Sequence, residues 1–336
     1  MSSQCIHSRL LQAGLAVGVG LAAWAVVRRI GRKIPAKNRP EAGPNQLETS
    51  SRALRKASER DHLPAPTRGA AKRLYQAAAM LSFSVLADSL LEHYRGCFAN
   101  RAMFIAPVVS ALSLAESSRA AISRDNGGGA VRKGLFGAAV LTGMAGLGFH
   151  LYNVVKREGG FGWHNLFYAA PIGAPGALSM AGLFGLAAEL LEHDSRQSRP
   201  ISNRAAGRGL AALSAFGLLG TMAEVLLLHF RGAFQDPIMY VPLIEPPVAG
   251  LALAAAAIEP TAGRVRAASV ILKSVGAMGV AGAFFHSYGI QRNMGGWRNW
   301  RQMVLQGPPV PAPPGFTGIA LAGLGALALL TPKERS

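Results

Sequence analysis

Residues 91–104, LEHYRGCFANRAMF, and residues 227–240, LLHFRGAFQDPIMY, carry the same side chains at the same spacing. In each stretch a histidine, an aromatic residue, an arginine and a glycine are followed by a phenylalanine two residues on and a methionine five residues later. The distance along the chain from His93 to His229 equals the distance from His150 to His286. We call this distance the repeat offset. Repetition at a fixed distance indicates a tandem duplication, which we place at residues 70–192 and 207–332.

The composition indicates a membrane protein. Half of the 336 residues are hydrophobic and only 15% are charged, whereas about 25% of residues are charged in a typical soluble protein. The charges lie in short clusters, and the apolar runs between them approach the roughly 20 residues with which a helix spans a bilayer. We therefore expect an all-α polytopic membrane protein.

Each repeat contains four apolar runs, which we predict as transmembrane helices. They lie at 75–94, 102–121, 134–155 and 172–191 in the first repeat, and at 209–230, 238–258, 268–290 and 315–331 in the second. With an N-terminal helix over residues 10–27, about nine transmembrane helices are expected. An even number of spans gives both repeats the same orientation, so the sequence predicts parallel repeats related by a pseudo-two-fold axis along the membrane normal.

The N-terminal apolar run allows two interpretations. A signal peptide fits Ala23-Trp24-Ala25, which resembles a cleavage site, but Arg28, Arg29, Arg32 and Lys33 follow the run directly, as they do after a membrane anchor. We favour the anchor, with residues 1–28 as the transmembrane segment. Residues 29–69 then form a basic cytoplasmic linker, and residues 193–206 form a polar linker between the repeats.

Basic residues set the expected orientation. Placing residues 29–74 in the cytoplasm also puts most of the 35 lysines and arginines there, in agreement with the positive-inside rule. The chain would lie in a plasma membrane, most simply a bacterial inner membrane, with its N-terminus outside and its C-terminus in the cytoplasm. The basic segment 28–73 is expected to contact anionic lipid headgroups. It lacks the interleaved aromatic residues of nucleic-acid-binding segments, so no nucleic-acid partner is predicted.

The repeated residues define a candidate site on the extracytoplasmic side. In the predicted topology one layer near that membrane surface contains the ends of the first and third helices of both repeats. Ionisable groups at such a depth suggest a functional site or a buried pair. Our candidates for a ligand or cofactor site are Asp88, His93, Arg95, His150, Glu224, His229, Arg231 and His286.

The four histidines among these residues are the candidate metal ligands. Imidazoles on facing helices are the usual axial ligands of haem b, and imidazoles with carboxylates also suit a transition metal. The first hypothesis is therefore a haem- or metal-binding membrane redox component. The two cysteines, Cys5 and Cys97, have no metal-binding spacing.

Three other interpretations remain open. His, Tyr, Trp and Arg all favour the membrane interface, so the repeated residues could be structural anchors. Parallel repeats also occur in small-solute transporters, and the chain could be a non-catalytic scaffold or assembly subunit. We found no nucleophile or acid–base pair with the spacing of a catalytic site, and this favours a protein that is not an enzyme.

A second shared feature follows the third helix of each repeat. Both copies run from a basic residue through paired glycines and aromatic residues into a proline-rich stretch, REGGFGWHNLFYAAPIGAP and RNMGGWRNWRQMVLQGPPVPAPP. Paired glycines permit a sharp turn. We predict a short interfacial helix here, acting as a membrane anchor or as a lid over a cavity.

Overall fold

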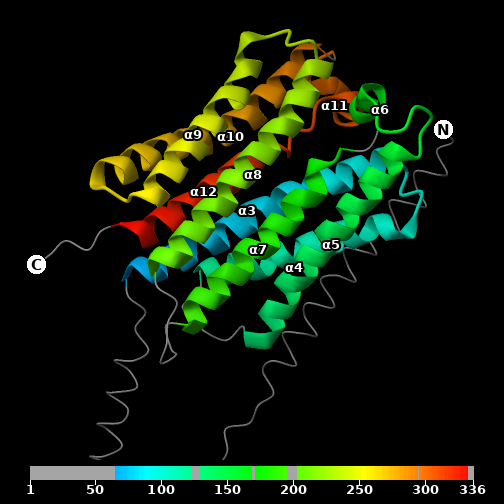
Figure 1. The fold of residues 1–336 in the computed structure, drawn as a ribbon. Coiled ribbons are helices and arrows are strands. Elements are labelled where there is room, and N and C mark those ends of the chain that lie inside the picture. The colour runs from blue at the N-terminus through cyan, green and yellow to red at the C-terminus, as the bar shows by residue number, and fades with distance from the viewer. Residues whose placement is uncertain (1–64, 123–128, 169–170, 195–202, 294, 332–336) are drawn as a thin grey trace, which may run out of the picture.

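The computed structural model describes residues 65–122, 129–168, 171–194, 203–293 and 295–331, and the helix is the regular element throughout these ranges (Figure 1). The first half of the chain contains α3 (Ala65–Arg95), η1 (Arg101–Phe104), α4 (Ile105–Ile122), α5 (Gly129–Val155), α6 (Trp163–Tyr168) and α7 (Gly173–Asp194). The second half contains α8 (Asn203–Arg231), η2 (Pro237–Tyr240), α9 (Val241–Ile258), α10 (Ala262–Asn293), η3 (Trp297–Asn299), α11 (Trp300–Gln306) and α12 (Pro314–Leu330).

Six of the described helices are long and apolar enough to cross a membrane, which is fewer than the nine that we predicted. α4 has 18 residues, but four serines together with Glu116 and Arg119 lower its mean hydropathy. α12 is strongly apolar but has only 17 residues, fewer than the roughly 20 that span a bilayer. The predicted helix at residues 10–27 and most of the predicted basic linker lie outside the described residues.

Each half of the chain forms a group of four helices. α3 packs against α4 and α7, and α5 packs against the same two helices, so α3 and α5 are diagonally opposite. In the second half α8 and α10 are diagonally opposite in the same way, because both pack against α9 and α12. α12 also lies along α3 and so joins the two groups (Figure 1).

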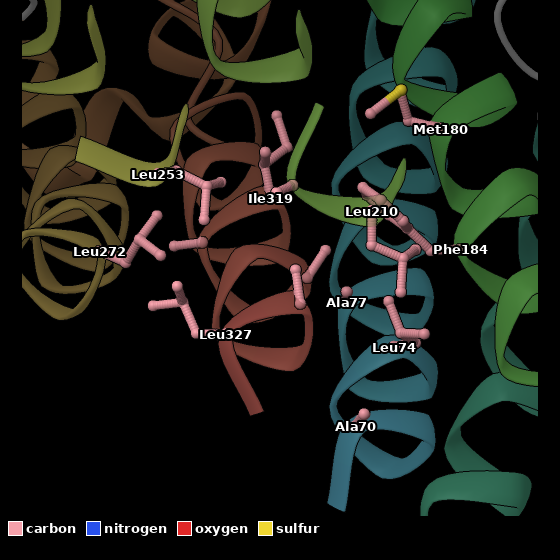
Figure 2. Packing of buried hydrophobic residues seen from close by; sticks show 14 of the residues in the cluster. Ala70, Leu74, Ala77, Met180, Phe184, Leu210, Leu253, Leu272, Ile319 and Leu327 are labelled. Atoms are coloured by element: carbon pink, nitrogen blue, oxygen red, sulfur yellow. The ribbon is translucent and has the colours of Figure 1, made fainter. Parts of the chain in front are cut away.

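Alanines and larger apolar side chains together fill the helix interfaces, and many other large apolar side chains face outward. Leu74 and Ala77 of α3, Phe184 of α7 and Ile319 of α12 belong to one buried cluster, which Figure 2 shows between the helices. Exposed residues include Phe216, Leu251 and Phe284, each more than 70% accessible. Large apolar side chains are costly in water but favourable in lipid, while small residues let membrane helices pack closely. This distribution supports a multi-pass membrane architecture.

The two halves do not meet through equal interfaces. α12 approaches α3 closely, and a Cβ atom on Gly318 would lie 3.2 Å from the Ala77 carbonyl oxygen. The corresponding pair, α7 and α8, makes fewer contacts, one of them between Met180 and Gly217. A two-fold axis would make both interfaces alike, so the predicted pseudo-two-fold relation is not exact here.

Replacing Gly182 by alanine is expected to destabilise the first helix group by about 1–3 kcal/mol, the typical cost of overpacking. A Cβ atom at this position of α7 would lie 2.5 Å from the Phe136 carbonyl oxygen of α5, so the two backbones would have to separate. Unfolding in mixed detergent micelles, followed by circular dichroism, measures the loss. The matched control is Gly137→Ala on α5, where the new methyl group meets open space; equal losses in both variants would contradict the explanation.

Candidate functional site

The repeated phrase ends the first helix of each half with the same cap. The Phe98 N–H donates to the His93 carbonyl oxygen (2.8 Å) and the Cys97 N–H to the Tyr94 carbonyl oxygen (2.9 Å). This pair of bonds is a Schellman motif, in which the residue after the helix adopts a left-handed conformation. Cys97 has φ 56°, and its counterpart Ala233 also has φ 56°. The recurrence of this conformation at two non-glycine residues shows that the local fold of the phrase is duplicated.

Aromatic stacking and a short 3₁₀ helix complete each turn. The Phe98 and Phe104 rings stack with centroids 4.3 Å apart, and Phe234 and Tyr240 stack at 4.6 Å. The Asn100 side chain caps η1 by accepting from the Ala102 N–H, as Asp236 does for η2. The shared spacing of the phrase is thus explained in part by a rigid connection between the first and second helices of each half.

All four repeated histidines bond to backbone carbonyl groups at the end of the bundle that carries α6 and α11. His93 Nδ1 lies 2.5 Å from the Met103 carbonyl oxygen, and His229 Nδ1 lies 2.7 Å from that of Met239. His150 Nδ1 bonds the carbonyl group of Pro171, and His286 Nδ1 bonds that of Pro309 at 3.0 Å. A hydrogen bond to a carbonyl oxygen requires the proton on Nδ1, which leaves the Nε2 lone pair available.

The histidines form two pairs, one within each helix group. His229 of α8 and His286 of α10 have ring centroids 6.5 Å apart. His93 of α3 and His150 of α5 lie close enough for their charges to interact. Each pair comes from diagonally opposite helices and therefore faces across the interior of its own group.

The two candidate carboxylates come from different halves of the chain. Asp88 of α3 is buried and lies within electrostatic reach of Glu92, Arg95 and Glu224. Glu224 of α8 accepts a hydrogen bond from the Gly173 N–H at the start of α7. A Cβ atom at position 173 would overlap the Glu224 carboxyl group, so any other residue there would displace that side chain from its present position. The Glu224 carboxyl oxygen thus satisfies one of the N–H groups that the start of a helix leaves without an intrahelical partner.

The two candidate arginines each reach from one half to the other. Arg95 of α3 donates to the carbonyl oxygen of Gly307 after α11 (2.8 Å), and Arg231 of α8 donates to that of Phe167 in α6 (3.3 Å). The Arg231 guanidinium also lies 5.3 Å from the centre of the Tyr168 ring. The short helices predicted after the third span are therefore present as α6 and α11, and each lies over the other half of the chain.

Among the described residues, no group of three or more His, Cys, Asp or Glu side chains could hold a metal ion. The sequence hypothesis of a transition metal ligated by the His layer and nearby carboxylates therefore has no supporting cluster in this part of the chain. The pairs of histidines remain, and two ligands suffice only for a cofactor that supplies the other donors itself.

A buried ionic cluster, which was not predicted from the sequence, lies at the opposite end of the first helix group. Arg132 of α5 is 2% exposed and forms ion pairs with Glu116 of α4 (2.9 Å) and Glu189 of α7 (2.6 Å). The Tyr75 hydroxyl group of α3 also bonds Glu189 (2.7 Å). Glu116 and Glu189 are visible in the sequence as charged residues within predicted apolar spans, but Arg132 precedes its span, and only the tertiary contacts bring the three side chains together.

Comparisons with known proteins leave the chain without an assigned family. No protein-family model, curated protein or solved structure matches it.

Proposed function

We propose that the protein is a membrane electron-transfer component that carries haem b, with one haem held by the two histidines of each helix group. The observation that supports this proposal best is the His229–His286 pair, with ring centroids 6.5 Å apart on diagonally opposite helices. A metal ion bound by both imidazoles at ~2 Å separates the ring centroids by about 6 Å. The observed separation is therefore suitable for axial ligation of one iron.

The hydrogen bonds of the histidines support the same proposal. Metal-ligating histidines almost always donate their other ring N–H to a carbonyl or carboxylate group, which fixes the ring orientation. All four rings have such an acceptor, namely the carbonyl groups of Met103, Pro171, Met239 and Pro309. Because the porphyrin provides four nitrogen donors, two imidazoles complete the coordination of its iron. Haem b is thus compatible with pairs of histidines, whereas a bare metal ion prefers additional side-chain ligands.

The proposal includes the finer architecture predicted from the sequence. Two parallel repeats, 70–192 and 207–332, would follow an N-terminal anchor in a bacterial inner membrane, with the C-terminus in the cytoplasm. Equivalent contacts in the two halves support the duplication. For example, Ser179 Oγ donates to the Val140 carbonyl oxygen, and Thr317 Oγ1 donates to that of Gly276. Both haems would then lie near the extracytoplasmic surface, where electron exchange with a soluble partner is direct.

The test is an absorption spectrum of the purified chain, expressed in cells supplied with a haem precursor. We expect a Soret band that shifts on reduction and two haems per chain, one for each bis-imidazole site. Metal analysis of the same sample separates haem iron from other metals. A colourless protein that also fails to take up added haemin would overturn the proposal.

A second candidate function is proton-coupled transport of a small solute. It is supported by Asp88 and Glu224, which come from different halves and lie within electrostatic reach of each other inside apolar helices. Ionisable residues in such positions commonly mark ion pathways. Solute-driven acidification of proteoliposomes that disappears in Asp88→Asn would favour this function, and the same variant would leave bound haem unchanged.

A further inference from the structure

A row of buried hydroxyl groups follows the contact between α3 and α4. Ser82 of α3 and Ser113 of α4 bond each other across this contact at 2.8 Å. Ser110 and Ser117 lie on the same face of α4 as Ser113, and all three side chains are completely buried. Ser89, two turns from Ser82 on α3, is 7% exposed. We call these five serines the hydroxyl line.

The hydroxyl line connects the two ends of the first helix group. On α3, Tyr75 and His93 share one face with Ser82 and Ser89, because their spacings are close to whole turns of the helix. His93 lies at one end, and Tyr75, which accepts a hydrogen bond from Arg132 (3.2 Å), lies at the other. These two residues are about 27 Å apart along the helix axis, so the line extends over most of the length of a transmembrane helix.

Two hydroxyl groups of the line have no hydrogen-bond partner among the described residues, namely Ser110 Oγ and Ser117 Oγ. A serine in a helix can donate to the carbonyl group four residues earlier, as Ser287 does on α10 (2.8 Å), but neither of these serines does. An unpaired hydroxyl group in an apolar interior costs about 1–3 kcal/mol. Ordered water commonly satisfies buried polar groups that lack a protein partner, so the two serines indicate bound water.

The spacing along the line is suitable for single water molecules. From the bond between Ser82 and Ser113, Ser110 and Ser117 lie one turn away in opposite directions along α4. These steps are about 4.5 and 6 Å. Steps of the same size lead on to the groups at the two ends, because α4 returns antiparallel to α3. One water that makes two hydrogen bonds of ~2.8 Å spans up to about 5.5 Å.

A third unpaired group lies at the Arg132 end of the line. Arg132 Nη2 is buried and has no acceptor among the described residues, although the other guanidinium nitrogens pair with Glu116 and Glu189. Glu116 precedes Ser117 in the chain, pairs also with Arg119, and is 13% exposed. Water that reaches Glu116 can therefore exchange protons with the line.

The second helix group packs without such a line. At the repeat offset, Ser82, Ser113 and Ser117 correspond to Leu218, Ala249 and Leu253. These three side chains are completely buried, so α8 and α9 pack through apolar groups where α3 and α4 use hydroxyl groups. The fold of a helix group therefore does not require the hydroxyl line.

Asp88 does not belong to the line. It lies on another face of α3, from which its charge interacts with Glu224 of α8. The hydroxyl line is therefore separate from the two carboxylates on which the second candidate function depends.

We propose that the hydroxyl line, completed by water bound at Ser110 and Ser117, is a path for protons through the first helix group. Each hydroxyl group or water accepts a hydrogen from the neighbour on one side and donates its own to the neighbour on the other. One proton that enters from solvent at one end is matched by one released at the other, and the groups then rotate back. Only O–H bonds form and break, and neither haem nor a solute is required.

Proton flux into proteoliposomes that contain the full chain tests the proposal. A potassium gradient with valinomycin sets the membrane potential, and a pH-sensitive dye inside the vesicles reports proton entry. We expect flux above that of protein-free liposomes. The triple variant Ser110→Ala, Ser113→Ala, Ser117→Ala should lower this flux about tenfold or more, since the loss of one hydrogen bond from the path is sufficient for that factor. Its haem content should be unchanged, because the serines are not haem ligands.

The matched control is Ser214→Ala, which removes a buried and unpaired hydroxyl group from the second half and should leave the flux unchanged. Wild-type flux no higher than that of protein-free liposomes would overturn the proposal without any substitution. Equal flux in the triple variant and the wild type, or an equal decrease in Ser214→Ala, would overturn it as well. Flux that is lost in Asp88→Asn but kept in the triple variant would assign proton movement to the carboxylates instead.

Discussion

Replacing His286 by alanine is expected to remove half of the haem from the purified protein and to leave the other half spectroscopically normal. One axial ligand of the second helix group is lost, and a single imidazole holds a b-type haem far more weakly than two. The first group keeps both of its ligands, because His93 and His150 belong to separate helices of another bundle. Haem content per chain, with the reduced-minus-oxidised spectrum, measures the effect.

Substitutions of other histidines check the assignment of two ligands to each haem. His229→Ala should give the same loss as His286→Ala, and the two together should cause no further loss, because they serve one site. A variant that combines His93→Ala with His229→Ala should contain no haem. His164→Ala is the control, since this exposed histidine of α6 contacts Tyr168 and lies outside both pairs. Haem content unaffected by His93→Ala, His229→Ala and His286→Ala would contradict the assignment of the ligands.

A purely structural role for these histidines would give a different outcome. If the bonds between Nδ1 and the backbone carbonyl groups serve only to connect the helices, each substitution would lower stability by roughly the 0.5–1.5 kcal/mol of one hydrogen bond. The loss would then be similar for all four residues and would occur in a colourless protein. Asparagine at position 229 offers a further distinction, because its amide N–H₂ can donate to the Met239 carbonyl oxygen but cannot ligate iron.

The sequence predicted the helical class and the positions of most helices because hydropathy depends on local composition. The apolar runs at 134–155 and 238–258 nearly match α5 and the η2–α9 segment. The paired glycines before Trp163 and Trp297 predicted the turns that precede α6 and α11. Gly159 and Gly295 have φ values of 86° and 84°, a region that glycine adopts at little cost.

The relation between the two halves could not be predicted from the same information. Symmetry of the sequence suggested symmetry of the packing, but Gly318 and Gly325 allow α12 to approach α3. The matching contacts of Ser179 and Thr317 show that α12 follows α7 at a slightly longer offset than the other helices. At this offset Gly318 and Gly325 correspond to Met180 and Ala187 of α7. Side chains there keep α7 from an equally close approach to α8. A few glycines thus decide which pair of helices joins the halves, and neither hydropathy nor charge reveals this.

The residues of the candidate site could be predicted from the sequence, but their arrangement in space could not. The repeat offset identified all four histidines, and their depth placed them at one end of the bundle. Their division into two pairs depends on which helices are diagonal, and this follows from tertiary contacts. The hydrogen bond between Glu224 and Gly173 was unpredictable for the same reason, because it joins residues of different halves.

Replacing Arg132 by methionine is expected to lower the free energy of unfolding by about 3–5 kcal/mol, the typical cost of breaking a buried ion pair from one side. Methionine retains most of the apolar volume, so the loss reports mainly on charge. The Arg132 guanidinium now lies 2.9 Å from Glu116 and 2.6 Å from Glu189. Without it both carboxylates would remain buried and lack their shared cation. Unfolding in mixed detergent micelles, followed by circular dichroism, measures the change.

The second half of the chain suggests how the loss can be reversed. There Ala252, Ala268 and Leu327 occupy the equivalent positions, and the helices still pack. The triple variant Glu116→Met, Arg132→Met, Glu189→Leu should therefore recover most of the stability lost in Arg132→Met, because the two carboxylates are no longer buried without their shared cation. The exposed pair Arg264–Glu259 is the control, and Arg264→Met should cost about 0–1 kcal/mol. A triple variant less stable than Arg132→Met would show that the network supports the fold beyond pairing its own charges. Recovery in the triple variant would show that the fold does not need the network, and the reason for its presence would then be chemical.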